Sequence, residues 1–392
     1  MIVVRGFCLA SLMAGVGSLV VGCSADAQSE IQQEGEDSVG EVSEAHKADW
    51  GKHDGRRGDS LYVGDQDDTV KKFNAKTGAF ESVFVTPGSG GLLGPRGLVF
   101  GKNENLLVVN QNVDTLINGE VLKYERKTGA FLGAVVSKSD RDAAFSPRGM
   151  VLKDRRLYVA SMGDPDYVLE GNPAPNPRPA RVAVFKEGGG EWLGDIAYGD
   201  FDMKCVGGVC TQWSPRALVF GPDGALYVTL MKFASNENPN LAPGRILKIS
   251  EYGTSKIFVD GDDCGGCGLA RPEGLAFGPN GKLYVTSFRK DPLTDNDKIL
   301  VFNGKTGAYE DKIDLDVAGA PRAFSQAILF GPRGKLFVSI LGNGPDTGSV
   351  RRYDVRSKTY DVFVPAAPVG PLVGAWYMTF GKTDPATLAY DD

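Results

Sequence analysis

The chain has 392 residues, of which 42% are hydrophobic, with 52 glycines and a formal net charge of −6. The hydrophobic fraction is sufficient for a large core, and the glycine count points to many tight turns. The net negative charge gives no electrostatic reason to expect a nucleic-acid partner. After the N-terminal segment, no apolar run is long enough for a membrane-spanning helix.

Residues 1–22 have the layout of a secretory signal peptide, with Arg5 followed by an apolar stretch. The sequence LVVGC at 19–23 resembles the bacterial lipobox, which predicts lipidation of Cys23. An ordinary signal peptide with an incidental cysteine is the alternative. Because Ser24 rather than Asp follows Cys23, we expect the outer membrane.

Residues 23–57 form the next segment. Between Ser24 and Trp50 it contains eight acidic residues and one lysine, and its apolar residues are isolated. Such a composition cannot bury enough surface to offset chain entropy. We therefore expect a disordered acidic tether, followed by one folded domain over 58–392.

An internal repeat dominates that domain, and a repeat of this length decides the fold. One phrase returns as PRGLVFG at 95–101, PRGMVL at 147–152, PRALVFG at 215–221, PEGLAFG at 272–278 and SQAILFG at 325–331. Each copy is followed by a second short run such as LYV at 226–228. Three of the connecting turns read GPDG, GPNG or GPRG, which is turn chemistry.

A second hairpin follows each pair of runs, as in VKKF at 70–73 and FESVF at 80–84. Each repeat therefore has four antiparallel strands, the unit of a propeller blade. The first LYV, at 61–63, lacks a preceding partner, whereas WYMTFG at 376–381 has no complete blade after it. We predict an all-β, six-bladed propeller whose first blade is closed by this C-terminal strand, which removes exposed edges. A β-helix or an open array is disfavoured by the split first and last repeats.

The stretch RPEGLAFGPNGKLYV at 271–285 resembles the repeats of NHL-type propellers and of the SMP-30/gluconolactonase-like group. The resemblance covers about 59–390 and implies a six-bladed propeller. It is weak evidence for function, because the same fold hosts lactonases, phosphotriesterases, lyases and pure binding proteins.

The residue after each repeated proline is expected near the propeller axis, on the face where the second strands end. Around the ring these positions are Arg96, Arg148, Arg216, Glu273, Gln326 and Trp376. Three successive arginines predict a positive axial mouth suited to carboxylate or phosphate. Pairing of the arginines with neighbouring blades, which would make them structural, stays the alternative.

The ends of the second strands supply mostly small polar residues, including Asp65 and Asn110. The SMP-30 resemblance implies an axial cation held by Glu, Asn and Asp, here Glu273, Asp65 and Asn110. However, the opening Glu-Gly-Pro phrase of that group is absent, and three arginines would oppose a cation. We expect no cofactor, with calcium as the alternative.

Four cysteines lie in the folded domain. Export favours disulfides, and proximity in sequence favours Cys205–Cys210 and Cys264–Cys267. A four-cysteine zinc site is one alternative, and a redox role for Cys264-Gly-Gly-Cys267, which lacks a thioredoxin-like context, is a less favoured one. Two long loops, 161–180 and 232–244, are expected on the same face as the arginines.

The two histidines, His46 and His53, fall in the tether or at its edge, which excludes a histidine triad inside the propeller.

Three candidate functions remain for the protein. The first is a monomeric, lipid-tethered module that binds a small anion, a glycan or an envelope protein. The second is a metal-dependent lactonase or esterase, and the third is a structural lipoprotein. We favour the first.

Overall fold

The computed structural model describes residues 59–163, 180–196, 204–206, 209–234 and 243–392. For residues 204–206, 209–211 and 233–234 it describes the backbone alone. The expectations for the signal peptide, Cys23 and the tether lie outside these residues. None of the helices in the described part of the chain has the length and apolarity that a membrane crossing requires.

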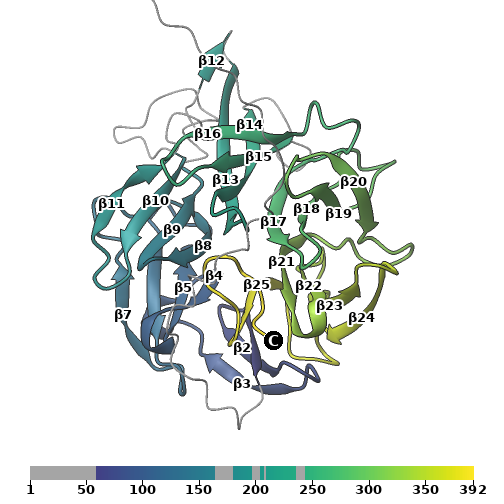
Figure 1. Cartoon of the computed structure of the whole chain (residues 1–392). Helices are drawn as coiled ribbons and strands as arrows, with labels where there is room; N and C mark the ends of the chain where they lie inside the picture. Colours follow the sequence, from purple (N-terminus) through teal and green to yellow (C-terminus); the bar gives the residue numbers. More distant parts are fainter. Residues whose placement is uncertain (1–58, 164–179, 197–203, 207–208, 235–242) are drawn as a thin grey trace, which may run out of the picture. The chain divides into compact units, whose positions relative to one another are not determined.

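Twenty-five strands form six sheets arranged as the blades of a propeller (Figure 1). From the centre outward, blade 1 contains β25 (Ala375–Phe380), β1 (Ser60–Asp65), β2 (Val70–Asn74) and β3 (Phe80–Val85). Blade 2 contains β4 (Pro95–Phe100), β5 (Leu106–Asn110), β6 (Glu120–Tyr124) and β7 (Phe131–Val136). Blade 3 contains β8 (Pro147–Lys153), β9 (Arg156–Ser161), β10 (Arg181–Lys186) and β11 (Trp192–Ile196).

Blade 4 contains β12 (Lys204–Val206), β13 (Val209–Phe220), β14 (Leu226–Ala234), β15 (Gly244–Ile249) and β16 (Ser255–Asp260). Blade 5 contains β17 (Pro272–Phe277), β18 (Lys282–Ser287), β19 (Lys298–Asn303) and β20 (Tyr309–Asp314). Blade 6 contains β21 (Ser325–Gly331), β22 (Lys335–Ile340), β23 (Ser349–Asp354) and β24 (Thr359–Val364). Short 3-10 helices occupy Ser89–Gly91, Lys102–Glu104 and Pro332–Gly334.

The predicted six-bladed ring and its closure are confirmed. In blade 1, β25 pairs antiparallel with β1, with Leu61 opposite Phe380 and Val63 opposite Met378. The last inner strand thus completes the first blade, so the N- and C-terminal ends of the repeat share one sheet.

Blade 4 differs from the expectation of four strands. Its inner strand β13 has 12 residues, and its first part pairs with the extra strand β12, with Val206 opposite Val209. This hairpin extends past the ring in Figure 1.

The repeat phrase is explained by contacts between blades. At five of the six blade interfaces, the aromatic residue of the second strand packs edge-to-face against the phenylalanine that ends the inner strand of the next blade. The pairs, with centroid distances of 4.9–5.2 Å, are Tyr62–Phe100, Tyr158–Phe220, Tyr227–Phe277, Tyr284–Phe330 and Phe337–Phe380. Between blades 2 and 3, Leu107 and Leu152 occupy one apolar cluster instead. Each aromatic pair contributes roughly 0.5–1.5 kcal/mol beyond area burial.

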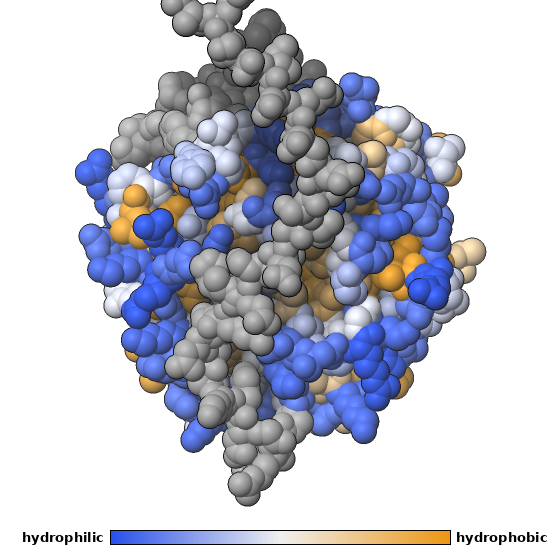
Figure 2. All heavy atoms as spheres, in the orientation of Figure 1, coloured by the Kyte–Doolittle hydropathy of each residue, from blue (hydrophilic) through white to orange (hydrophobic). Residues whose placement is uncertain are grey.

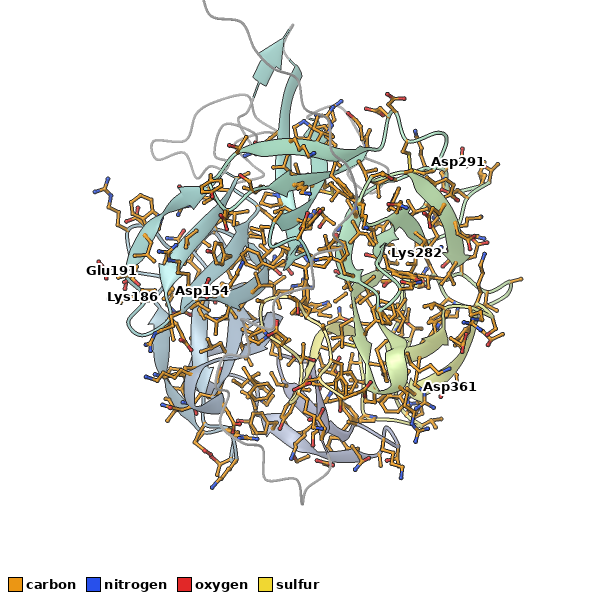
Figure 3. The ribbon with its side chains drawn as sticks, in the orientation of Figure 1. Asp154, Lys186, Glu191, Lys282, Asp291 and Asp361 are labelled. Atoms are coloured by element: carbon orange, nitrogen blue, oxygen red, sulfur yellow. A yellow bond between two sulfur atoms is a disulfide. The ribbon has the colours of Figure 1, made fainter. Side chains whose placement is uncertain are left out.

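Burial falls from the axis outward. The inner strands β4 and β25 are buried at every position, whereas the outer strands β3 and β7 are buried only at their last two positions. Figure 2 shows hydrophilic side chains over much of the outer part of one face, with smaller apolar areas between them. Charged side chains such as Glu191 and Asp361 lie at the rim in Figure 3.

The C-terminal residues after β25 contact the ends of the inner strands. Leu152 donates its backbone N–H to Pro385 O at 2.8 Å, and Phe220 donates to Ala386 O at 3.0 Å. Leu388 packs against the apolar clusters of several blades. Because inner strands start at the arginine face, this tail covers the opposite end of the axis.

Candidate functional site

All six inner strands break their pairing register at the predicted axial position. The register shifts lie between Pro95 and Leu98 in blade 2 and at the corresponding places in the others. Such β-bulges re-aim a side chain out of the ladder. Hydroxyls of the second strands satisfy the bulged backbone in three blades, as where Ala217 N–H donates to Thr229 Oγ1 at 2.9 Å.

The bulged residues are buried. Exposed fractions are 9% for Arg148 and less for the other five, Arg96, Arg216, Glu273, Gln326 and Trp376. Gln326 donates to the carbonyl of Phe324 at 3.1 Å. The remaining members of this ring meet in one group of charged and aromatic side chains.

Arg96 is held by two neighbours. Its Nε donates to Gln111 Oε1 at 2.6 Å, and its guanidinium carbon lies 3.6 Å from the centre of the Trp376 ring. Its Nη1 is buried and has no hydrogen-bond partner among the described residues. Burial, reinforced by Arg148, lowers the pKa of Arg96.

Arg148 and Arg216 share a thioether. Arg148 Nε and Arg216 Nη1 both lie 3.1 Å from Met162 Sδ, and Arg216 Nη2 lies 3.1 Å from Met231 Sδ. A thioether is a weak acceptor. These two guanidinium groups therefore point donors at atoms that a carboxylate or phosphate oxygen would outcompete.

Glu273 is the carboxylate of the cluster. Its Oε1 lies 3.0 Å from Arg271 Nε and 3.7 Å from Arg216 Nη1. Burial alone would raise the pKa of Glu273, but Arg216, Arg271 and Arg148 bring it down to about 2. Burial lowers the pKa of Arg216 to about 9, against the opposing effect of Glu273. The Glu273 Oε2 atom is buried without a hydrogen-bond partner among the described residues.

Tyr377 is a member of this cluster that was not predicted. The position after the bulged residue is small in five blades and tyrosine in the sixth: Gly97, Gly149, Ala217, Gly274, Ala327 and Tyr377. Tyr377 is buried and interacts electrostatically with Glu273, Arg148, Arg96 and Arg216, which come from four different blades. At the three glycines a Cβ would come within about 3 Å of the inner-strand backbone of the next blade, so these positions are small because neighbouring inner strands approach closely. The departure of Tyr377 from the small residue of the other five repeats was visible in the sequence and could have revealed it.

Burial raises the pKa of Tyr377 to about 12, and its hydroxyl has no hydrogen-bond partner among the described residues. Tyr377 is therefore a neutral donor at physiological pH. The cluster as a whole has four guanidinium groups (Arg96, Arg148, Arg216 and Arg271) and one carboxylate (Glu273), which gives a formal charge of 4 − 1 = +3.

The backbone that carries the cluster is strained at three places. Ser146, Arg271 and Phe324 immediately precede the bulged strands of blades 3, 5 and 6 and have φ of +47°, +35° and +45°. Non-glycine residues with positive φ are uncommon, and such strain clusters at functional sites. At Arg271 this conformation accompanies the contact between its guanidinium and Glu273.

The other predicted ligands have protein partners elsewhere. Asp65 pairs with Lys71 and accepts hydrogen bonds from the backbone of Val373 and Gly374. Asn110 accepts from Leu93 N–H at 2.8 Å and donates to other side chains. Together with the pairing of Glu273 to arginines, these contacts do not fit the three-residue cation site that the SMP-30 resemblance implies. Among the described residues, no three His, Cys, Asp or Glu side chains gather as a metal site would require.

The structure contains the predicted disulfide between Cys264 and Cys267. Cys205 and Cys210 lie directly opposite each other in the β12–β13 pairing, where only the backbone is described. Their disulfide stays a prediction. Most of the two long loops, 164–179 and 235–242, lies outside the described residues.

No family model and no curated protein matches the chain. Solved structures that match include a proposed gluconolactonase, with 16% identity and a TM-score of 0.43 over 74% of this chain and 82% of that one. A luciferin-regenerating enzyme matches with 13% identity and a TM-score of 0.44 over 70% and 75% of the two chains. Regucalcin, a calcium-binding protein from Agrobacterium tumefaciens, matches with 12% identity and a TM-score of 0.41 over 67% and 72%. At this identity the likeness concerns the fold alone.

Proposed function

We propose that the propeller binds a small organic anion at the axial arginine cluster and that the protein is exported and anchored through lipid on Cys23. One observation carries the anion site: four buried or mostly buried guanidinium groups face a single carboxylate. The guanidinium groups outnumber the carboxylate of the cluster, and excess positive charge in the interior is costly, so a bound anion would compensate it.

The way the arginines are bonded supports a ligand rather than a purely structural role. A structural arginine between blades is expected to donate to carboxylates or carbonyls. Here Arg148 donates to a thioether, and Arg96 leaves Nη1 without a partner among the described residues. Charge-assisted bonds to an anionic oxygen are roughly twice as strong as neutral ones.

Two further atoms suggest the shape of the ligand. The Tyr377 hydroxyl offers a donor, and Glu273 Oε2 offers an acceptor. A ligand with an anionic group could bind the arginines and accept a hydrogen bond from the Tyr377 hydroxyl, and a hydroxyl group on the same ligand could donate to Glu273 Oε2. The low exposure of the cluster restricts such a ligand to a small molecule.

The pKa values of Glu273 and Tyr377 favour ligand binding over acid–base catalysis. A general acid or base works best with a pKa near the operating pH. The pKa of Glu273 is about 2 and that of Tyr377 about 12, so neither group exchanges protons readily at neutral pH. Both histidines of the chain precede the described residues.

The alternative is a metal-dependent lactonase or esterase of the SMP-30 type. Its counterparts among solved structures are the gluconolactonase and regucalcin named above, whose likeness extends to the fold. In this alternative Glu273, Asp65 and Asn110 would hold the cation, but all three have the protein partners described above. The proposal therefore stays with anion binding.

A thermal-shift series on the mature protein tests the proposal with inorganic phosphate, succinate and citrate as probes. A ligand at 100 times its Kd stabilises the fold by about 2.7 kcal/mol, so the unfolding temperature should rise with at least one anion and not with matched chloride. The same preparation is assayed for bound metal and for lactone hydrolysis with and without calcium. Calcium-dependent turnover without any anion effect would replace this proposal with the alternative.

A further inference from the structure

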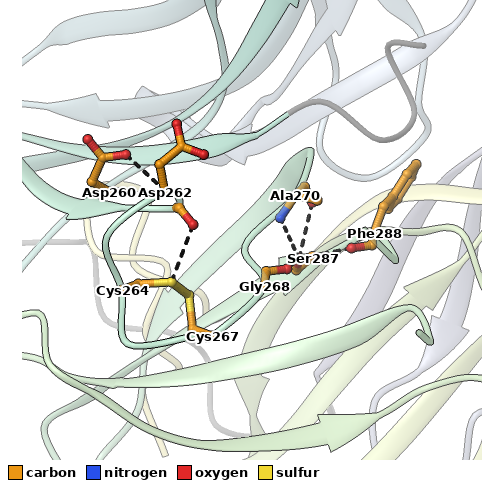
Figure 4. Close-up of a disulfide and its surroundings, with 9 residues drawn as sticks. Asp260, Asp262, Cys264, Cys267, Gly268, Ala270, Ser287 and Phe288 are labelled. Carbon is orange, nitrogen blue, oxygen red and sulfur yellow. Dashed lines mark hydrogen bonds between the residues drawn. A yellow bond between two sulfur atoms is a disulfide. The ribbon is translucent and has the colours of Figure 1, made fainter. Parts of the chain in front are cut away.

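The loop that delivers Arg271 to the axial cluster is closed by the Cys264–Cys267 disulfide (Figure 4). This loop runs over 261–271, between β16 and β17. Gly265, Gly266 and Gly268 all have positive φ, at 65°, 79° and 67°. Glycine loses more conformational freedom on folding than any other residue. The disulfide therefore restrains a segment whose sequence gives it little rigidity of its own.

After the disulfide, hydrogen bonds hold the loop to blade 5. Ala270 N–H donates to Ser287 Oγ at 3.0 Å (Figure 4). Arg271 then lies over the Phe288 ring at 4.8 Å and contacts Glu273. Only three residues separate Cys267 from Arg271, so the restraint acts close to the charged group.

The two sulfurs differ in their access to solvent. Cys267 is 4% exposed, whereas Cys264 is half-buried and lines a surface pocket of about 440 Å³. Asp260, Asp263 and Tyr309 also line this pocket. Cys264 is therefore the more accessible half of the disulfide, and accessible disulfides are the ones that undergo exchange.

We propose that Cys264–Cys267 is a thiol–disulfide exchange site for a dithiol reductant and that its reduction weakens anion binding at the axial cluster. The second part rests on the proposed function. A thiolate of the reductant attacks Cys264 Sγ, the sulfur–sulfur bond breaks, and Cys267 leaves as a thiolate that takes a proton. The second thiol of the reductant then attacks the reductant sulfur that is bonded to Cys264. This closes a disulfide within the reductant and releases Cys264 as a thiolate, which takes a proton. The reductant ends as a disulfide and the protein as a dithiol.

The pocket favours one class of reductant. Asp260 is ion-paired with Arg245, and the exposed carboxylate of Asp263 repels an anionic thiol such as glutathione. A neutral dithiol does not meet this repulsion, and its second thiol completes the reaction without a further molecule. Once reduced, the glycine-rich loop gains freedom, and Arg271 spends less time against Glu273.

The test uses the mature protein with dithiothreitol and with glutathione as separate reductants. Alkylation and peptide mapping identify the cysteines that become free under native conditions. Hydrogen exchange over 261–271 and the affinity for the best anion of the thermal-shift series are measured before and after reduction. We expect dithiothreitol to free Cys264 and Cys267, exchange over the loop to rise at least tenfold, and the Kd to rise at least threefold.

The double variant Cys264→Ser/Cys267→Ser should match the reduced protein in exchange and in affinity, and it should not respond to dithiothreitol. The double variant Cys205→Ser/Cys210→Ser is the control, and it should keep the full response. A Kd that stays constant although Cys264 and Cys267 are free would overturn the coupling. If no anion binds the oxidised protein, the proposed function fails, and the mapping and exchange data still decide whether the exchange site exists.

Discussion

Arg96 and Trp376 join the closure of the ring to the charged centre. The guanidinium carbon of Arg96, on the inner strand of blade 2, lies 3.6 Å from the ring centre of Trp376, on the C-terminal strand of blade 1. The strand that closes the propeller thus also supplies the cation–π partner of an axial arginine. Tyr377, the next residue on that strand, is buried and interacts electrostatically with Glu273 and with three axial arginines. Closing the ring and completing the candidate site are therefore one structural event.

Replacement of Trp376 should weaken the fold substantially. Trp376→Leu removes a buried ring that is 5% exposed and its contact with Arg96. We expect a loss of about 2–4 kcal/mol in the free energy of unfolding, measured with urea. Trp192→Leu is the control, because Trp192 is 42% exposed on an outer strand, and it should change stability by less than about 1 kcal/mol. Equal effects of the two substitutions would contradict the role given to Trp376.

Removal of the Tyr377 hydroxyl should separate stability from binding. Because this buried hydroxyl has no hydrogen-bond partner among the described residues, Tyr377→Phe should leave the unfolding temperature unchanged or raise it. The same variant should bind the anion several-fold more weakly. Tyr124→Phe is the comparison, since Tyr124 donates to Ser89 O at 2.8 Å and its loss should cost about 1 kcal/mol. A strong loss of stability in Tyr377→Phe would show that its hydroxyl is a structural group.

The carboxylate of Glu273 should make stability depend on acid pH. Its pKa of about 2 in the folded protein lies below the ordinary value of 4.5, so its contribution is complete above about pH 4.5 and disappears as the pH falls toward 2. This difference corresponds to about 3 kcal/mol. The stability gap between wild type and Glu273→Gln should therefore be largest near pH 6 and shrink steadily below pH 4.5. Denaturant unfolding at several pH values measures the gap, and a gap that is independent of pH would refute the assignment.

Arg271 should show a conflict between backbone strain and function. Its φ of +35° is unfavourable for any residue with a side chain. Arg271→Gly should therefore be more stable than Arg271→Ala by about 1 kcal/mol, as compared by urea midpoints. Both variants should bind the anion more weakly to the same degree, because both lack the guanidinium. If glycine and alanine variants were equally stable, the strain would have no energetic consequence.

The ring was predictable because each repeat carries its own packing contacts. Phe277 of the phrase PEGLAFG at 272–278 packs against Tyr227 of the preceding blade, so the phrase includes a contact between blades. The unpaired LYV at 61–63 likewise identified WYMTFG as the closing strand. The axial position of Arg96, Arg148, Arg216 and Glu273 followed from the same alignment of repeats.

Arg271 and Met162 at the axial cluster could not be predicted from the alignment of the repeats, because they lie outside the repeated phrase. Arg271 reaches Glu273 through a left-handed backbone before a proline, and Met162 enters from the end of a second strand. The fifth strand of blade 4 arises from pairing beyond the repeat. Asp65 and Asn110 lie at the positions that the alignment of repeats predicted. Their side chains, however, accept hydrogen bonds from the backbone of neighbouring loops rather than joining the axial cluster.

The central claim is that the arginines at the axis bind an anion, and calorimetric titration with inorganic phosphate and succinate tests it most directly. Wild-type protein, Arg148→Gln and Arg352→Gln are compared, the last being a control on a peripheral ion pair with Asp361. We expect saturable binding of one anion per chain to wild type and to Arg352→Gln, with at least tenfold weaker binding to folded Arg148→Gln. Equal affinities in all three proteins, or no heat of binding in wild type with either anion, would contradict the account.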